Sequence, residues 1–268
     1  MTNEFPQLSR DLSLLSRLIR GGFVRTISNR SLLLITSLFY LLVVLMLSGL
    51  WRAAAEANGG SVVGYSTTAL VWYAVTTEAA ILVIPQRLIE MIGQDIIDGR
   101  IETDIALPTP VVNLRFGAEF GQSLAKLVAV GVVGFIFGIV VGGLPVSWAG
   151  LALGIPSLML AVAVNIAFQL ALIGATFWVR ESKSSWFLQQ KLVFLFGGML
   201  LPLEVLPRSL EIASKIMPFS SMAYAPARLI SGHVEPQWLA IQVGWLAVLW
   251  SLAVVVFRRG ERRYVAAP

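Results

Sequence analysis

The residues best suited to chemistry lie in one short polar segment of a chain that is otherwise apolar. Residues 94–104 read Gln-Asp-Ile-Ile-Asp-Gly-Arg-Ile-Glu-Thr-Asp. This segment and its flank hold five of the 15 acidic side chains, namely Glu90, Asp95, Asp98, Glu102 and Asp104. Neighbouring carboxylates can work as a general acid and base, or they can present a charged surface to a partner protein. In a chain with only 13% charged residues, their concentration predicts a docking segment.

Other catalytic arrangements are missing from the sequence. The chain has no Cys and a single His, His233, so it cannot by itself build a thiolate site or a metal site of several histidines. It contains neither the phosphate-binding pattern G-x-x-x-x-G-K-[ST] nor the nucleophile elbow G-x-S-x-G. We therefore expect a protein that is not an enzyme on its own and that binds no cofactor or metal in this chain.

The composition is typical of a helical membrane protein. Hydrophobic residues make up 57% of the chain, and the mean hydropathy is +0.79. Several continuous apolar runs reach the roughly 20 residues that a helix needs to cross a bilayer core of about 30 Å. The basic residues behind the net charge of +5 cluster at the ends of these runs, as the orientation rule for membrane proteins predicts. We expect an all-α, polytopic protein of the inner or plasma membrane, with no nucleic-acid partner.

Hydropathy and turn residues predict six transmembrane helices in a single domain, residues 1–268. The predicted spans are residues 31–51, 67–91, 119–143, 149–179, 191–201 and 238–257. Residues 202–235 are interrupted by prolines and are predicted to form short external, re-entrant helices between the last two spans. If the N-terminus is cytoplasmic, only four of the 20 Lys and Arg residues fall on the external side of the membrane, namely Arg52, Arg208, Lys215 and Arg228. Both termini are therefore expected in the cytoplasm.

Residues 6–30 precede the first span and show helical periodicity. Leu8, Leu12, Leu15 and Ile19 fall on one face of a helix, while the arginines lie largely elsewhere. This pattern favours an amphipathic helix that lies in the membrane interface and contacts anionic lipid head groups. The alternative is a basic flank that only orients the first span.

The polar segment of residues 92–112 is predicted to be a cytoplasmic loop with helical structure. Apolar residues recur every three or four positions from Leu88 to Ile105, which predicts a short amphipathic helix or a helix pair broken at Gly99. One face would pack against the membrane domain, and the other would present charged side chains to a partner. A solvated loop with an acidic face is the alternative.

Glu78 lies near the middle of the second predicted span. A charge at that depth costs about 3 kcal/mol on insertion scales, so Glu78 should face protein or water rather than lipid. It could be a carboxylate of a substrate pathway that suits a cationic or amphipathic cargo. It could equally be a protonated or hydrogen-bonded residue that fixes helix packing.

Small residues recur on the third predicted span, where Gly134, Gly138 and Gly142 are four residues apart. This spacing lets two helix backbones approach closely in lipid. Packing within one subunit is the favoured interpretation, and the seam of a dimer is the alternative.

Four short motifs occur in a fixed order along the chain. The first runs from Glu90 to Ile101 and ends at Leu107-Pro108. The second contains Gly197-Gly198-Met199, Pro202-Leu203-Glu204 and Pro207, followed by Met217-Pro218-Phe219. The third is Tyr224-Ala225-Pro226 with Ser231-Gly232, and the fourth is the basic ending Phe257–Tyr264. In this order they resemble the coupling region, external helices and closing motif of the type-2 permeases of ATP-binding-cassette (ABC) exporters. The resemblance is strongest to a subgroup with two paralogous permeases per ATPase.

Two positions depart from the family pattern. Leu107 precedes Pro108 where an Arg is common, which puts a contact carried by that Arg in question. Gly197 stands where a Ser is common, so no role is assigned to it.

The resemblance implies a permease subunit that couples ATP hydrolysis in a separate subunit to outward movement of a substrate. Two permeases would form a dimer, the second being a paralogue or a second copy of this chain. Two copies of a cytoplasmic ABC ATPase would bind ATP and magnesium. In the coupling loop, the rim against the ATPase would consist of Asp95, Asp98, Arg100 and Glu102. Gly99 would permit the turn, and Ile96 and Ile97 would anchor the helix.

The resemblance also places a translocation pathway. Pro202, Glu204, Pro218 and Phe219 would close its outer end, and Glu78 would line it within the membrane. The rival hypothesis is a secondary transporter that uses an ion gradient through Glu78 and needs no ATPase. A membrane scaffold without transport activity is a third. The sequence does not identify the cargo.

Overall fold

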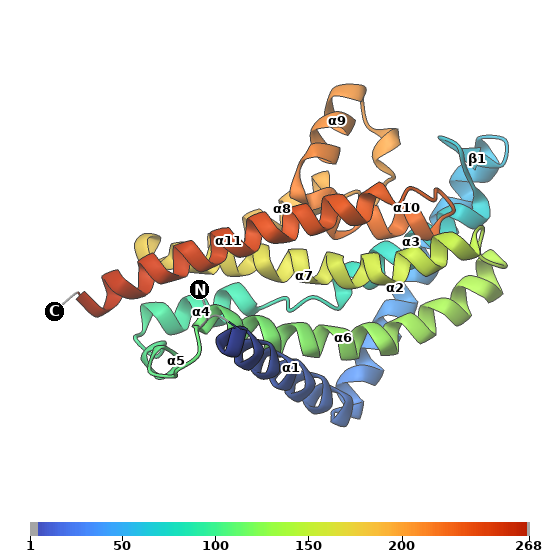
Figure 1. Ribbon diagram of the computed structural model, residues 1–268. Helices are drawn as coiled ribbons and strands as arrows, with labels where there is room; N and C mark the ends of the chain where they lie inside the picture. The colour runs from blue at the N-terminus through green and yellow to red at the C-terminus, as the bar shows by residue number, and fades with distance from the viewer. Residues whose placement is uncertain (1–4, 267–268) are drawn as a thin grey trace.

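The computed structural model describes residues 5–266, with side chains described for residues 13–182 and 184–264. Its elements form an elongated helical bundle (Figure 1). In chain order they are α1 (Phe5–Ser28), α2 (Arg30–Ala57), β1 (Ser61–Val62), β2 (Tyr65–Ser66), α3 (Thr67–Leu82), α4 (Leu88–Ile97), α5 (Glu102–Ile105), α6 (Val111–Phe137), η1 (Gly138–Gly142), α7 (Trp148–Val179), α8 (Lys183–Phe196), η2 (Leu203–Val205), α9 (Arg208–Ile216), η3 (Pro218–Met222), α10 (Tyr224–Ile230) and α11 (Gln237–Ala266).

Four helices of the described chain are long and apolar enough to cross a membrane. They are α2, α6 continued through η1, α7, and α11 as far as Tyr264. Hydroxyl and amide side chains begin two of them, since Asn29 accepts from the backbone N–H of Leu32 and Ser147 from that of Gly150. These helices support an all-α, multi-pass membrane protein, and they contain the first, third, fourth and sixth predicted spans.

The second and fifth predicted spans differ from the helices that the chain forms. The predicted span 67–91 is two helices, α3 and α4, joined by a linker of residues 83–87 that contains Pro85. Proline cannot donate the backbone hydrogen bond that a continuous helix requires, so α3 ends at Leu82. The predicted span 191–201 is also displaced. Its helix, α8, starts at Lys183 and ends at Phe196, before Gly198 with φ +66°. Helix α3 has 16 residues and α8 has 14, so they are about 24 and 21 Å long.

Helix α7 is the centre of the bundle. It lies between α11 and α6 in Figure 1, and 67% of its most apolar 18-residue window is buried. The corresponding fraction is 17% for α2 and for α11, whose apolar outer faces remain exposed. Helix α3 is buried on all sides from Ala69 to Ala80. A helix that is apolar all round belongs in such a core, whereas an exposed apolar face suits lipid.

Helix α1 packs across the first half of α6, as Figure 1 shows. The contact depends on glycines, because a Cβ added at Gly22 would collide with the carbonyl of Ala118 and one at Gly121 with that of Ile19. Sequence periodicity predicted a helix at residues 6–30, and α1 has nearly those bounds. The location of α1 in the membrane interface stays a prediction.

The glycine stripe of the third span packs inside the chain. A Cβ added at Gly134 would collide with Tyr40 of α2, one at Gly138 with Trp72, and one at Gly142 with Val71 of α3. Bulky side chains of α2 and α3 therefore fill the space that the glycines leave on α6 and η1.

Candidate functional site

The polar segment forms two short helices at one end of the bundle. Helices α4 and α5 lie at the end of the bundle where α11 terminates, opposite the β1–β2 hairpin (Figure 1). The break between them falls at Gly99, which has φ +82° and lies where a Cβ would come within 3.1 Å of the Tyr264 hydroxyl. An L-residue with a side chain rarely adopts this backbone conformation. The helix pair thus has the break at Gly99 that the periodicity predicted.

The α4–α5 segment, residues 88–107, is held firmly against the bundle. Gly93 lies directly against Ser182 and Thr176 near the end of α7. The guanidinium of Arg180 donates to the carbonyl of Ile97 at 3.5 Å, and the hydroxyl of Tyr264 donates to Glu102 at 3.1 Å. The side chains that α4 buries are apolar, namely Leu88, Ile89, Ile92 and Ile96. Ile97 is half-buried beside them. Helix α4 is thus attached to the end of α7, and α5 is attached to α11.

The charges of this segment are largely paired with one another. Arg100 lies 3.0 Å from Asp95 Oδ1 and 2.7 Å from Asp98 Oδ2, and the hydrogen bond to Asp95 raises the pKa of Arg100. Arg115 pairs with Asp104. Asp98, Arg100 and Glu102 are exposed, and Asp95 is half-buried. The face predicted as an acidic rim is thus a mixed surface in which arginines offset the carboxylates.

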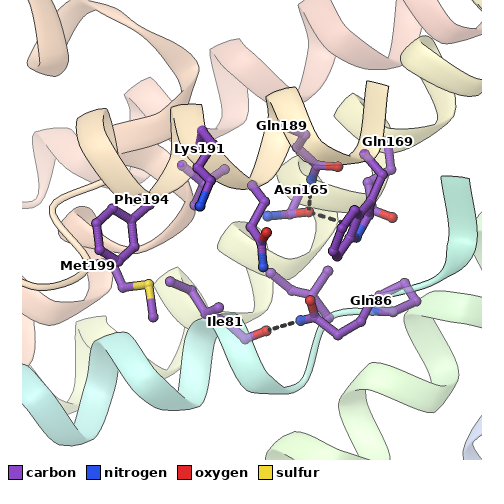
Figure 2. Close-up of a pocket in the computed structure, with 13 residues that line it drawn as sticks. Ile81, Gln86, Asn165, Gln169, Gln189, Lys191, Phe194 and Met199 are labelled. Atoms are coloured by element: carbon purple, nitrogen blue, oxygen red, sulfur yellow. Dashed lines mark hydrogen bonds between the residues drawn. The ribbon is translucent and has the colours of Figure 1, made fainter. Parts of the chain in front are cut away.

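The linker between α3 and α4 forms one wall of a cavity of about 300 Å³. Ile84, Pro85 and Gln86 line it from the linker, and the opposite wall comes from α7 and α8. Five of the lining side chains are amides, so we call it the amide pocket: Gln86, Asn165, Gln169, Gln189 and Gln190. Figure 2 shows Asn165, Gln169 and Gln189 converging from α7 and α8, with Gln86 across from them.

Hydrogen bonds in the amide pocket converge on one oxygen. The side-chain amides of Gln169 and Gln189 both donate to Asn165 Oδ1, at 2.9 and 3.0 Å. The amide nitrogen of Asn165 has only the sulfur of Met222 at 3.5 Å, and Oε1 of Gln169 has no partner in the part of the chain that the structure describes. All three amides are at most 6% exposed. Buried polar atoms without partners are uncommon and call for an explanation.

Glu78 is buried on α3, with 6% of its surface exposed. Its Oε1 finds no hydrogen-bond partner among the described residues, and Glu78 does not line the amide pocket. The structure thus places it within protein rather than lipid, as the cost of a membrane charge predicts.

Comparison with known families decides the identity of the chain at the family level. The family model described as ABC-2 family transporter protein matches residues 33–268. The chain belongs to this family. Searches of curated proteins and of solved structures gave no match. As an ABC-2 chain, it is a membrane permease subunit of the kind that works with an ABC ATPase. Helix α1 lies outside the matched residues.

The residues predicted at the outer end of this ABC-2 permease have two different environments. Glu204 accepts hydrogen bonds from Tyr224 and Arg228, and Lys215 lies 3.4 Å from it. Phe219 is packed edge-on against Phe168, at 5.4 Å between ring centroids, in an apolar cluster with α7 and α8. Pro202 is buried and Pro218 half-buried, each at the start of a short helix.

Sequence reasoning missed the amide pocket of this ABC-2 permease. Asn165 and Gln169 are one helical turn apart in a helix that is otherwise apolar, which is a usable signal because such residues face other protein in a membrane. The predicted span 191–201 begins at Lys191, and hydropathy alone does not indicate that Gln189 and Lys191 lie opposite α7.

Proposed function

We propose that the chain is the permease of an ABC exporter, which moves a substrate outward with energy from ATP hydrolysed by a separate cytoplasmic subunit. The observation that carries the proposal is the α4–α5 segment. It buries an apolar face against α7 and exposes a charged face at the end of the bundle where α11 terminates. A surface of this kind suits a water-soluble partner protein, because paired charges at an interface provide register and partner choice.

The end of the bundle with α4 and α5 is proposed to be cytoplasmic. Arg180 and the arginines at the end of α11 belong to this end, and α1 reaches it through its contact with the first half of α6. A membrane protein retains positive flanks on the cytoplasmic side. Both termini would then be cytoplasmic, and the β1–β2 hairpin would be external.

The coupling mechanism follows from the contacts of α4. Closure of the ATPase on ATP would push the exposed residues Asp98, Arg100 and Glu102, and the rigid helix would transmit the push to α7 through Gly93. The same movement would shift the linker and thereby the wall of the amide pocket. A functional unit would hold two ATPase copies and two permeases, the second a paralogue of this chain or a second copy of it.

Transport driven by an ion gradient is the second candidate. Oε1 of buried Glu78 has no hydrogen-bond partner among the described residues, which favours this candidate, since a buried carboxyl group can carry a proton. This candidate requires transport by the chain alone in proteoliposomes without ATP.

The first test is purification of the chain from its native membrane in a mild detergent, with identification of the proteins that accompany it. We expect a soluble ATPase and a second permease chain. Recovery of the chain alone, with transport that needs no ATP, would overturn the proposal in favour of Glu78.

Substitutions in the α4–α5 segment test the coupling directly. Asp98→Lys removes a partner of Arg100, and Gly99→Pro cannot adopt φ +82°. We expect each to lower transport at least tenfold in the reconstituted complex while ATP hydrolysis continues. Glu56→Lys, an acid-to-lysine change on the exposed far end of α2, is the matched control and should transport normally. Normal export by the Asp98 and Gly99 variants would contradict the coupling role.

A further inference from the structure

The amide pocket contains polar groups that the described protein leaves without adequate partners. Gln169 and Gln189 use their nitrogens on the same oxygen of Asn165. Among the described residues, that arrangement leaves Gln169 Oε1 unpaired and leaves the Asn165 nitrogen with a thioether, which is a weak acceptor. Leaving such groups buried and unpaired costs about 1–3 kcal/mol each, so an occupant that pairs with them is stabilised by the same groups.

The charge of the pocket is one-sided. Among its lining residues Lys191 is the single charged side chain, and none is a carboxylate. Figure 2 shows its amino group directed from α8 towards the α3 side of the cavity. Within the described chain its amino nitrogen lies over the ring of Phe187, 5.0 Å from the ring centroid. Lys191 has no ion pair among the residues that the structure describes, and such a lysine on a largely apolar helix suits an anionic ligand.

The remaining wall of the pocket is apolar. Ile81, Ile84, Phe194 and Met199 line it beside the amides. A volume of about 300 Å³ is at the lower end for small-molecule sites, so it fits a head group rather than a whole drug-sized molecule. The hydrocarbon part of a ligand would extend along the apolar wall.

We propose that the amide pocket binds the anionic head of an amphipathic substrate. Lys191 pairs with the anion, the amides of Asn165 and Gln169 hydrogen-bond the polar atoms around it, and the apolar wall contacts the first part of the tail. This inference rests on the proposed transport function and names its substrate class. Because the linker of residues 83–87 is both a wall of the pocket and the lead-in to α4, the occupied site is adjacent to the coupling segment.

Binding can be measured through Trp186, which lines the pocket. The full-length chain, with the subunits that accompany it, is titrated in neutral detergent with dodecyl phosphate brominated at the first carbons of its chain, and tryptophan quenching is recorded. The same titration uses brominated dodecanoate, dodecyl maltoside and dodecyltrimethylammonium. We expect saturable quenching by the two anions, at least tenfold weaker binding of the neutral and cationic amphiphiles, and loss of the signal in Trp186→Phe. The relative affinities for dodecyl phosphate and dodecanoate then show whether the pocket prefers a phosphate or a carboxylate head group.

The variants separate charge recognition from general lipid adsorption. Lys191→Gln should weaken binding of dodecyl phosphate about tenfold, and Lys191→Arg should retain it. Lys126→Gln is the matched control, because Lys126 lines a neighbouring cavity with Glu119. Equal binding of all four amphiphiles to the unmodified chain, or unchanged binding in Lys191→Gln, would overturn the inference. The titration contains no ATP, so a failure to bind the anionic amphiphiles would leave the coupling proposal untouched. Conversely, a purification that recovers no ATPase would leave the binding result intact.

Discussion

Two polar clusters of this ABC-2 permease differ in how fully their groups are paired. The outer cluster consists of Tyr65, Glu204, Lys215, Tyr224, Arg228 and Glu235. In it, Glu204 accepts from Tyr224 and Arg228, and Arg228 also pairs with Glu235 at 2.6 Å. The amide pocket has a single charge, Lys191, and leaves Oε1 of Gln169 unpaired in the described chain. The charged groups of the outer cluster thus pair with one another and join parts of the fold, whereas the one charged side chain of the amide pocket has no ion pair among the described residues.

The outer cluster joins elements that are far apart in the sequence. Tyr65 is on β2, Glu204 on η2, and Tyr224 and Arg228 on α10. Glu204 and Arg228 are 17% and 15% exposed in their side chains, so each depends on the other for compensation of its charge. Removal of one partner of a mostly buried pair is more damaging than loss of an exposed pair.

Arg228→Ala should produce the largest loss of stability. It leaves Glu204 and Glu235 without their main cation, and we expect the free energy of unfolding to fall by about 3 kcal/mol. Thermal unfolding in detergent measures the effect. The control is Arg208→Ala, since the Arg208 side chain is 78% exposed and its pair with Glu211 should contribute less than about 1 kcal/mol. Equal effects of the two variants would remove the contrast between the outer cluster and an ordinary surface pair.

Gln169→Leu should separate stability from function in the amide pocket. The substitution removes one hydrogen bond and a buried oxygen that has no partner in the described part of the chain, while Gln189 still donates to Asn165. We expect stability to change by less than about 1 kcal/mol, because replacing an imperfectly paired polar group with an apolar one can be nearly neutral. Binding of dodecyl phosphate should fall several-fold in the same preparation. A loss of stability as large as that of Arg228→Ala would show that the pocket amides are structural.

The smallest expected effect is a pH dependence at the edge of the outer cluster. His233 packs against Tyr65 with ring centroids 4.4 Å apart and ring planes tilted by 43°, and it lies near the charges of Arg228, Glu204 and Glu235. Burial, followed by the charge of Arg228, lowers the pKa of His233 from its ordinary value of 6.5. The unfolded chain therefore takes up a proton near pH 6.5 that the folded chain does not, so stability is full above this pH and falls below it.

The comparison is between thermal stability at pH 7 and at pH 5. Because His233 is partly exposed, solvent screening should limit the loss to about 0.5 kcal/mol. The hydrogen bond to Lys215 lowers the pKa of Glu211. Burial raises the pKa of Glu235, but its hydrogen bond to Arg228 and the charge of Arg228 give a net lowering. Both carboxylates therefore remain ionised between pH 5 and pH 7. His233→Gln should remove the pH dependence. Its persistence in that variant would assign it to another group.

Local pattern is sufficient for much of this fold. Hydropathy predicted the four long helices because each carries enough apolar surface along one stretch of chain, and Gly99 marked the break between α4 and α5 because of its backbone freedom. The linker at Pro85 was also visible in the sequence, but the apolar residues on both sides of it favoured one span. The structure has two helices there, since α3 ends at Leu82 and α4 begins at Leu88.

Each of the two polar clusters is assembled only in the tertiary structure. Asn165 and Gln169 of α7 line the same pocket as Gln189 and Lys191 of α8, and Glu204 of η2 contacts Arg228 of α10. Helical periodicity states which residues share a face of one helix, but it carries no information on which face of another helix lies opposite. That choice depends on close packing between helices, as at the glycines of α6 and η1 that admit Tyr40 and Trp72. Whether a polar side chain is paired or left open to a ligand is therefore decided by packing.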